Sequence, residues 1–226
     1  MALDEAITVA RFKNLVPNTL RFFRWEPSAV SIGYFQGMLE EVDTDACDSK
    51  GIDYVRRRTG GGAVYHDRDG ELTYSLFINQ EHRLVSKDFQ ETYGTLCSGL
   101  VRGLRFLGVQ AEFKPINDIV VGGKKVSGNA QTRGMNVVHQ HGTILLKVDP
   151  SLMFLVLKGL KGSPTSLHGL LGREISFEEL KEVLIKGFEV SFKIRLIQGA
   201  LTKFEEQKAA ELKNKKYAKK GWNFKR

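Results

Sequence analysis

The sequence predicts an α+β fold in which a mainly antiparallel central sheet is flanked by helices. Strand-like runs dominate the chain up to Pro150, and the pattern beyond it is helical. Three strand-like runs, VQAEFKP, DIVVGGKKVSGNAQT and HQHGTILLKVD, follow one another without room for crossover helices, so we expect them to pair antiparallel. We expect a single domain over residues 1–226, with its helical part at about 150–226.

The first third of the chain alternates short helices and strands. Residues 3–10 carry apolar side chains at helical spacing, which predicts a first helix that ends before the turn at Pro17 and Asn18. LRFFRW and AVSIGYF predict two strands separated by residues 26–28. Residues 43–50 are typical of a short helix that ends near Gly51, with strands at IDYVRRR and ELTYSLFI after it.

A long helix and a hairpin follow. Apolar residues step by three or four from Phe89 to Leu107, with Ser86 or Asp88 as the candidate cap. The glycine pair at 122–123 predicts a hairpin. Later, Ser176 and Glu179 form a capping-box pattern, and residues 204–217 predict a last amphipathic helix.

Composition limits the class of protein. A net charge of +8 favours an anionic partner, although a solvated helix face explains the lysine-rich end equally well. Nucleic-acid binding is disfavoured because no helix-turn-helix, zinc-finger or RNP pattern is present. We also expect no membrane segment, signal peptide or disulfide. Two cysteines without metal-ligand spacing, Cys47 and Cys97, fit a reducing, cytoplasmic compartment.

The segment RRRTGGGAVYHD is the most glycine-dense part of the chain. Three arginines at 56–58 precede Thr59 and the glycines at 60–62. Glycines let backbone N–H groups approach a ligand, and guanidinium groups make paired hydrogen bonds to phosphate or carboxylate. The segment therefore predicts an anion-binding loop, with a flexible hairpin as the alternative; it is neither a Walker A nor a Rossmann sequence.

The segment NDIVVGGKKVSGNAQTR places two lysines after the hairpin glycines. Strand alternation puts Lys124 and Lys125 on opposite faces, so we expect one of them to point to a shared site; solvated surface is the alternative. A metal site at the histidines is disfavoured, because His139 and His141 have no nearby acidic third ligand and His66 is isolated in a loop. No G-x-S-x-G elbow supports a serine hydrolase.

Together with MALDEAI, SIGYFQ and the closing KFEEQKAAELKNKKYAKKGWN, these motifs resemble the lipoate-protein ligases over nearly the whole chain. The resemblance implies the biotin/lipoate ligase catalytic-domain fold, which is related to class II aminoacyl-tRNA synthetase cores. It also implies that lipoate and ATP give lipoyl-AMP, and that the acyl group then passes to a lysine. The implied acceptors are lipoyl domains of 2-oxoacid dehydrogenase complexes and the glycine cleavage H protein.

The resemblance also assigns roles to residues of this sequence. Lys125 would be the catalytic lysine that contacts the carboxylate and the α-phosphate. Asn117 and Asp118 would orient phosphate and the Mg²⁺ that arrives with ATP. The acyl pocket and the adenylate would be held by Arg57, Thr59, Gly60, Gly61, Gly62 and Ala63, and the strand near the acyl chain would contribute Gly33, Phe35 and Gln36.

The sequence bears on three alternative functions. The octanoyltransferase branch uses no ATP and has a cysteine nucleophile, which lies close before or well after the lysine strand. In this sequence FKPIND, just before that strand, lacks a cysteine, and none follows Cys97. Cys97 itself falls on or beside a buried helix face. Biotin ligase is disfavoured because its G-R-G-R-x-G loop is absent. A non-catalytic lipoate-binding protein would not need Lys125 and Asp118. Lipoate and octanoate remain undistinguished, because both need only a narrow apolar slot.

Lipoate-protein ligases often carry a small C-terminal domain, either fused or as a separate chain. This sequence stops where the resemblance to the large domain ends, so we expect a separate small accessory subunit to be needed for full activity. The sequence begins within the first helix, so we expect the strand that precedes this helix in relatives to be missing, either because the start is trimmed or because that sheet edge is built differently.

Overall fold

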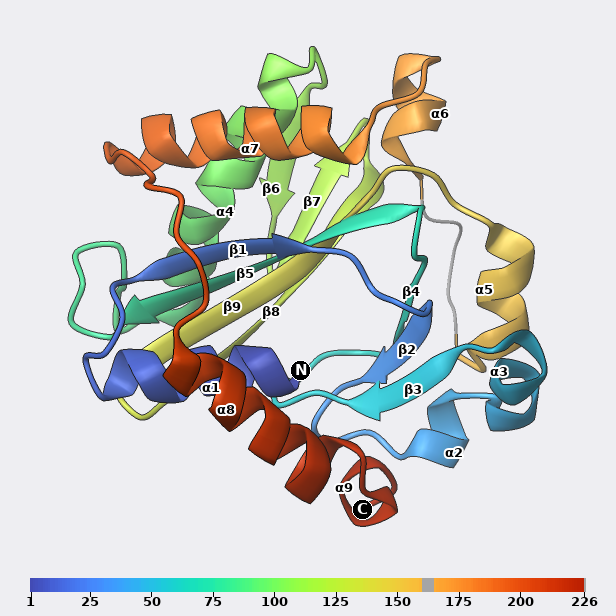
Figure 1. The fold of residues 1–226 in the computed structure, drawn as a ribbon. Coiled ribbons are helices and arrows are strands. Elements are labelled where there is room, and N and C mark those ends of the chain that lie inside the picture. Colours follow the sequence, from blue (N-terminus) through green and yellow to red (C-terminus); the bar gives the residue numbers. More distant parts are fainter. Residues whose placement is uncertain (160–164, 226) are drawn as a thin grey trace.

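A computed structural model describes residues 1–159 and 165–225, and it confirms the predicted α+β fold around a large antiparallel sheet (Figure 1). The sheet has six strands in the order β1-β5-β9-β8-β7-β6, and every neighbouring pair is antiparallel. Its strands are β1 (Thr19–Phe23), β5 (Glu71–Asn79), β9 (Val137–Leu145), β8 (Lys124–Gly134), β7 (Asp118–Val121) and β6 (Ala111–Lys114).

Helices cover both faces of this sheet (Figure 1). On one face, α4 (Phe89–Phe106) and α7 (Phe177–Phe192) bury the main core against Tyr74, Leu76 and Ile144. On the other face, α1 (Ala2–Phe12) packs its Ile7 against Phe77 of β5 and Val137 of β9, with α8 (Lys203–Leu212) alongside α1. Strand alternation therefore gives β5 and β9 one apolar face toward α4 and α7 and a second, partly polar face toward α1.

A second, three-stranded sheet was not predicted. In it, β2 (Ala29–Ile32) pairs parallel with β3 (Asp53–Arg56) and antiparallel with β4 (Val64–His66). A separate apolar cluster joins this sheet to α2 (Met38–Glu41), α3 (Thr44–Lys50) and α5 (Pro150–Val156). The glycine-rich segment joins β3 to β4, so it belongs to the small sheet and not to the large one.

Helix ends follow local sequence signals, with some differences from the prediction. Asp88 caps α4, because its side chain accepts a hydrogen bond from the N–H of Glu91. Ser176 caps α7, but the complete reciprocal capping box lies at Thr202 and Glu205 of α8.

The remaining helices are α6 (Leu167–Leu171) and, beyond α8, a π-helix, η1 (Lys213–Tyr217), and a short α9 (Lys220–Asn223). The last helix predicted at 204–217 is thus divided between α8 and η1. Within the helical region predicted at 150–226, residues 160–164 and Arg226 lie outside the described residues. In the described ranges, no helix has the length and apolar character needed to cross a membrane.

Candidate functional site

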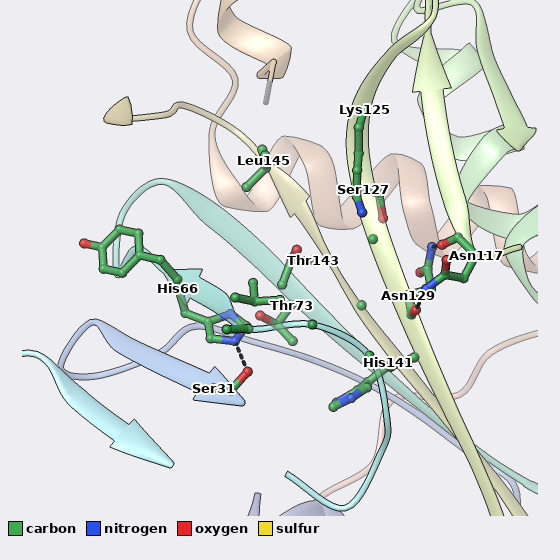
Figure 2. Close-up of a pocket in the computed structure, with 18 of the residues that line it drawn as sticks. Ser31, His66, Thr73, Asn117, Lys125, Ser127, Asn129, His141, Thr143 and Leu145 are labelled. Atoms are coloured by element: carbon green, nitrogen blue, oxygen red, sulfur yellow. Dashed lines mark hydrogen bonds between the residues drawn. The ribbon is translucent and has the colours of Figure 1, made fainter. Parts of the chain in front are cut away.

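A cavity of about 520 Å³ lies between the two sheets, a size typical of small-molecule sites. The large sheet contributes side chains of β5, β8 and β9, and the small sheet contributes Ser31, β4 and the glycine-rich loop. Met153 and Leu157 add apolar surface. In Figure 2, His66 lies at one side of the view and Asn117 at the other, with Lys125 projecting from β8.

Lys125 lies at the cavity and forms an ion pair with Asp118, whose Oδ1 is 2.7 Å from the lysine Nζ. Its side chain runs over Gly128, because a Cβ at that position would come within 2.9 Å of the lysine Cε. Lys124 also borders the cavity. Lys124 and Lys125 pair in regular register with Val121 and Val120, so strand alternation still directs their side chains to opposite faces; the shift in the β7–β8 ladder comes after Lys125, where Val126 is an extra residue.

Asn117 lines the cavity beside Lys125. It is fixed to β8 by reciprocal bonds: its Nδ2 donates to the carbonyl of Asn129, and the Nδ2 of Asn129 donates to the carbonyl of Asn117 at 2.8 Å. Asp118 does not line the cavity itself and is linked to it through Lys125. An amide oxygen and a carboxylate at this edge are the hard oxygen ligands that Mg²⁺ prefers, so these residues fit a nucleotide-bound Mg²⁺.

The guanidinium of Arg57 holds the glycine-rich loop from within, which differs from the paired anion contacts expected from the sequence. Its Nε donates to Thr59 Oγ1, and its Nη1 donates to the carbonyl and hydroxyl of Ser31. Its Nη2 donates to the carbonyls of Gly60 and Gly62 at 2.8 and 2.7 Å. Burial lowers the pKa of Arg57 to about 10, which leaves it charged at neutral pH. Arg57 still borders the cavity.

Arg56 is also used internally, and it lies outside the cavity lining. Its side chain is 1% exposed and donates to backbone carbonyls on two segments. These carbonyls belong to Gly33, Tyr34 and Gln36 and to Trp222, Asn223 and Lys225. Arg56 therefore joins the C-terminal segment to the turn after β2.

The free hydrogen-bond donors of the glycine-rich loop are backbone N–H groups and not the arginine side chains. Two of its carbonyls point to Arg57, and within the described residues the N–H groups of residues 60–63 make no hydrogen bond. Gly61 has φ +92°, a conformation that favours glycine. Gly61, Gly62 and Ala63 line the cavity, whereas Thr59 and Gly60 lie behind it. Free N–H groups in such a turn are a suitable site for an anion.

The three residues predicted beside the acyl chain do not line the cavity. Gly33 supports the loop from behind, because a Cβ on it would lie 2.0 Å from the carbonyl oxygen of Gly61. The Gln36 Oε1 accepts a hydrogen bond from the N–H of Gly33 at 2.9 Å. Phe35 is 89% exposed, so its ring faces solvent. Gly33, Phe35 and Gln36 therefore belong to the turn after β2, which supports the glycine-rich loop.

Trp25 and His66 form an aromatic part of the cavity that was not predicted from the sequence. Their rings stack with centroids 4.1 Å apart and planes at 15°. His66 is not isolated in a loop: it lies on β4, with Nδ1 2.7 Å from Glu71 Oε1 and Nε2 2.8 Å from Ser31 Oγ. A further row from β9, His141, Thr143 and Leu145, could have been found from alternation in HQHGTILL.

The structure brings an acidic side chain to the histidine pair, contrary to the prediction. Asp4 Oδ2 lies 3.6 Å from His139 Nε2 and 3.9 Å from His141 Nδ1. Asp4 belongs to α1, so local spacing around the histidines could not reveal it. Its Oδ1 is 2.8 Å from the Arg21 guanidinium, which already balances the carboxylate charge. The cluster therefore does not need a metal ion for charge balance.

Neither cysteine lines the cavity. Both thiols are free and buried, and Cys97 Sγ accepts a hydrogen bond from Gln140 on the core side of β9. Burial raises the pKa of the Cys97 thiol to about 12 and that of Cys47 to about 11. Because the thiolate is the reactive form, neither cysteine is prepared to act as a nucleophile.

Fold and cavity together define a small-molecule site in which an apolar, aromatic slot ends at a lysine and at a glycine-rich loop with free N–H groups. Residues 1–189 match the model of the lipoyl protein ligase A/B catalytic domain. The chain belongs to this family, whose members act in protein lipoylation as ligases or transferases.

Three similar proteins illustrate both branches. The octanoyltransferase LipM of Symbiobacterium thermophilum is 38% identical, over 100% of this chain and 93% of that protein. A bi-partite lipoate protein ligase of Thermoplasma acidophilum, described with its E2 lipoyl domain, is 31% identical with a TM-score of 0.85, over 99% of this chain and 89% of that one. A lipoate-protein ligase A bound with ATP is 31% identical with a TM-score of 0.85, over 99% and 92% of the two chains.

Proposed function

We propose that this protein activates lipoate, or an acid of similar length, with ATP and transfers the acyl group to a lysine of a lipoyl-accepting protein. The observation that supports this proposal best is that Lys125 and a loop with free backbone N–H groups border the same cavity, which neither Cys47 nor Cys97 lines. The ATP-bound ligase of similar fold supports the proposal. The proposed acceptors are lipoyl domains of 2-oxoacid dehydrogenase complexes and the glycine cleavage H protein.

In the first step, a carboxylate oxygen of the acid attacks the α-phosphorus of ATP, and the bond from that phosphorus to the bridging oxygen breaks. Acyl-AMP and pyrophosphate result. This reaction brings two anions together, so the Lys125 ammonium and the loop N–H groups lower its barrier by offsetting charge. Asp118 and Asn117 would hold Mg²⁺, which neutralises phosphate charge when bound.

In the second step, the neutral amine of the acceptor lysine attacks the acyl carbon. A carbon–nitrogen bond forms, the bond to the phosphate oxygen breaks, AMP leaves, and the amine loses a proton. The apolar part of the cavity holds the acyl chain in place for this attack, which removes much of its entropic cost.

An ATP-independent octanoyl or lipoyl transferase is the second candidate, and the name of the LipM relative favours it. Such an enzyme takes the acyl group from a thioester and, by the resemblance above, holds it on a cysteine. The burial of Cys47 and Cys97 and the raised pKa of each thiol weigh against this route in this chain.

Removal of both thiols separates the two routes. We expect the Cys47→Ser/Cys97→Ala variant to keep ATP-dependent acylation of an acceptor domain, measured by mass spectrometry of the acceptor with lipoate or octanoate, because neither thiol takes part in the chemistry. A parallel reaction with an acyl-carrier thioester and no ATP should leave the acceptor unmodified. Acylation from the thioester that disappears in the variant would establish the transferase route instead.

We further propose that a separate small subunit completes the enzyme, as the bi-partite ligase of similar fold suggests. We expect lipoate-dependent exchange of pyrophosphate into ATP to be slow with this chain alone and to rise at least tenfold when the companion is added, because the proposed enzyme is complete only with the second chain. Brisk exchange by this chain alone would reject the requirement.

A further inference from the structure

A line of buried groups connects the glycine-rich loop to the large sheet. Arg57 Nε donates to Thr59 Oγ1 at 3.1 Å, and the same oxygen lies 2.7 Å from His141 Nε2. Thr59 is fully buried, and His141 is 6% exposed. Since Arg57 supplies one proton to the Thr59 oxygen, the threonine's own hydroxyl proton is available to His141. This bond joins a residue of the small sheet's loop directly to β9.

The protonation state of His141 fits a hydrogen bond that the Thr59 hydroxyl donates and His141 accepts. Burial lowers the pKa of His141 well below its ordinary value, so the ring is neutral and one nitrogen can accept. Its Nδ1 faces Asp4 Oδ2 at 3.9 Å, which favours the proton on Nδ1 and leaves Nε2 as the acceptor. His139 lies beside the same oxygen and stacks on Phe77, with centroids 4.7 Å apart, so the cluster is packed against the sheet.

We propose that His141 is a positioning residue for the anion-binding loop, acting through the hydroxyl of Thr59, and that Asp4 selects the tautomer of His141. Within residues 1–159 and 165–225, the bond between Thr59 and His141 is the one hydrogen bond that attaches the loop to β9. The Thr59–His141 bond therefore sets how far the free N–H groups of the loop stand from Lys125. The inference rests on the proposed function, because the ligand it concerns is the acyl-adenylate.

Variants that alter only the hydroxyl test the bond with little change in packing. We expect Thr59→Val to weaken binding of a non-hydrolysable acyl-adenylate analogue about tenfold, measured by calorimetry, because a positioned hydrogen bond is lost. Thr59→Ser should restore it. KM for the acid should rise in Thr59→Val while kcat at saturation changes less. Thr132→Val, on β8 outside the cavity, is the matched control and should bind like the parent.

A double-mutant cycle with His141→Gln tests whether the two residues act as a unit. We expect the double variant Thr59→Val/His141→Gln to bind no more weakly than the weaker single variant, because both remove the same bond. Additive losses, or a Thr59→Val protein that binds like the parent, would overturn the inference. If the parent binds no adenylate analogue, the proposed function fails. The same double-mutant cycle is then measured by thermal unfolding, and coupling between Thr59 and His141 decides whether the bond itself exists. If His141→Gln does not fold, the Thr59→Val and Thr59→Ser pair alone decides.

Discussion

Replacement of Lys125 by alanine is expected to lower the rate of acyl-adenylate formation by roughly 10²–10³-fold or more, the size of effect seen when one preorganised electrostatic group is removed. The lysine is the cation that the structure places at the cavity beside Asn117 and Asp118, where carboxylate and α-phosphate would meet. Its side chain is half exposed, so its removal should leave folding nearly unchanged. Lipoate-dependent pyrophosphate exchange, with the companion present, measures the rate.

Lys114→Ala provides the control, because Lys114 is an exposed lysine of the edge strand β6, which β7 separates from β8, and it lies outside the cavity lining. It should exchange pyrophosphate like the parent. Calorimetric binding of the acid should be kept by Lys125→Ala, since most of the cavity surface is apolar. A Lys125→Ala protein that acylates the acceptor at the parental rate would show that the assigned role is wrong.

The large sheet and the long helices could be predicted because their signals are local. The apolar steps from Phe89 to Leu107 and the successive strands around Gly122 and Gly123 each report a period that a short window reveals. The small sheet could not be predicted in the same way. Strand β4 has three residues, and the parallel pairing of β2 with β3 depends on contacts between segments that α2 and α3 separate.

The candidate site could likewise be predicted only in part. Glycines beside arginines predict an anion-binding loop, which stays a prediction, and sequence cannot show whether a guanidinium faces a ligand or the protein's own carbonyls. Arg57 and Arg56 face carbonyls, and the loop's donors are backbone N–H groups, which have no sequence signature beyond the glycines themselves. The Asp4–His139–His141 cluster was missed because its members meet only when α1 packs on β9.

Replacement of Gly33 by alanine is expected to displace the anion-binding loop and to weaken binding of the acid at least tenfold. The new Cβ would lie 2.0 Å from the carbonyl oxygen and 3.0 Å from the carbonyl carbon of Gly61, and both are backbone atoms that cannot rotate away. The strands on both sides of this contact are fixed by the small sheet, so the loop must move. Overpacking of this kind costs about 1–3 kcal/mol of the free energy of unfolding.

Gly60→Ala is the matched control, because a Cβ at Gly60 meets no atom within 4 Å and Gly60 does not line the cavity. Its backbone also lies outside the left-handed region, so alanine introduces no strain there. Chemical unfolding should place Gly60→Ala within about 0.5 kcal/mol of the parent, and calorimetry should show parental binding. Equal losses in the two variants would mean that any added methyl group disturbs the loop, and that close support by Gly33 does not determine its position.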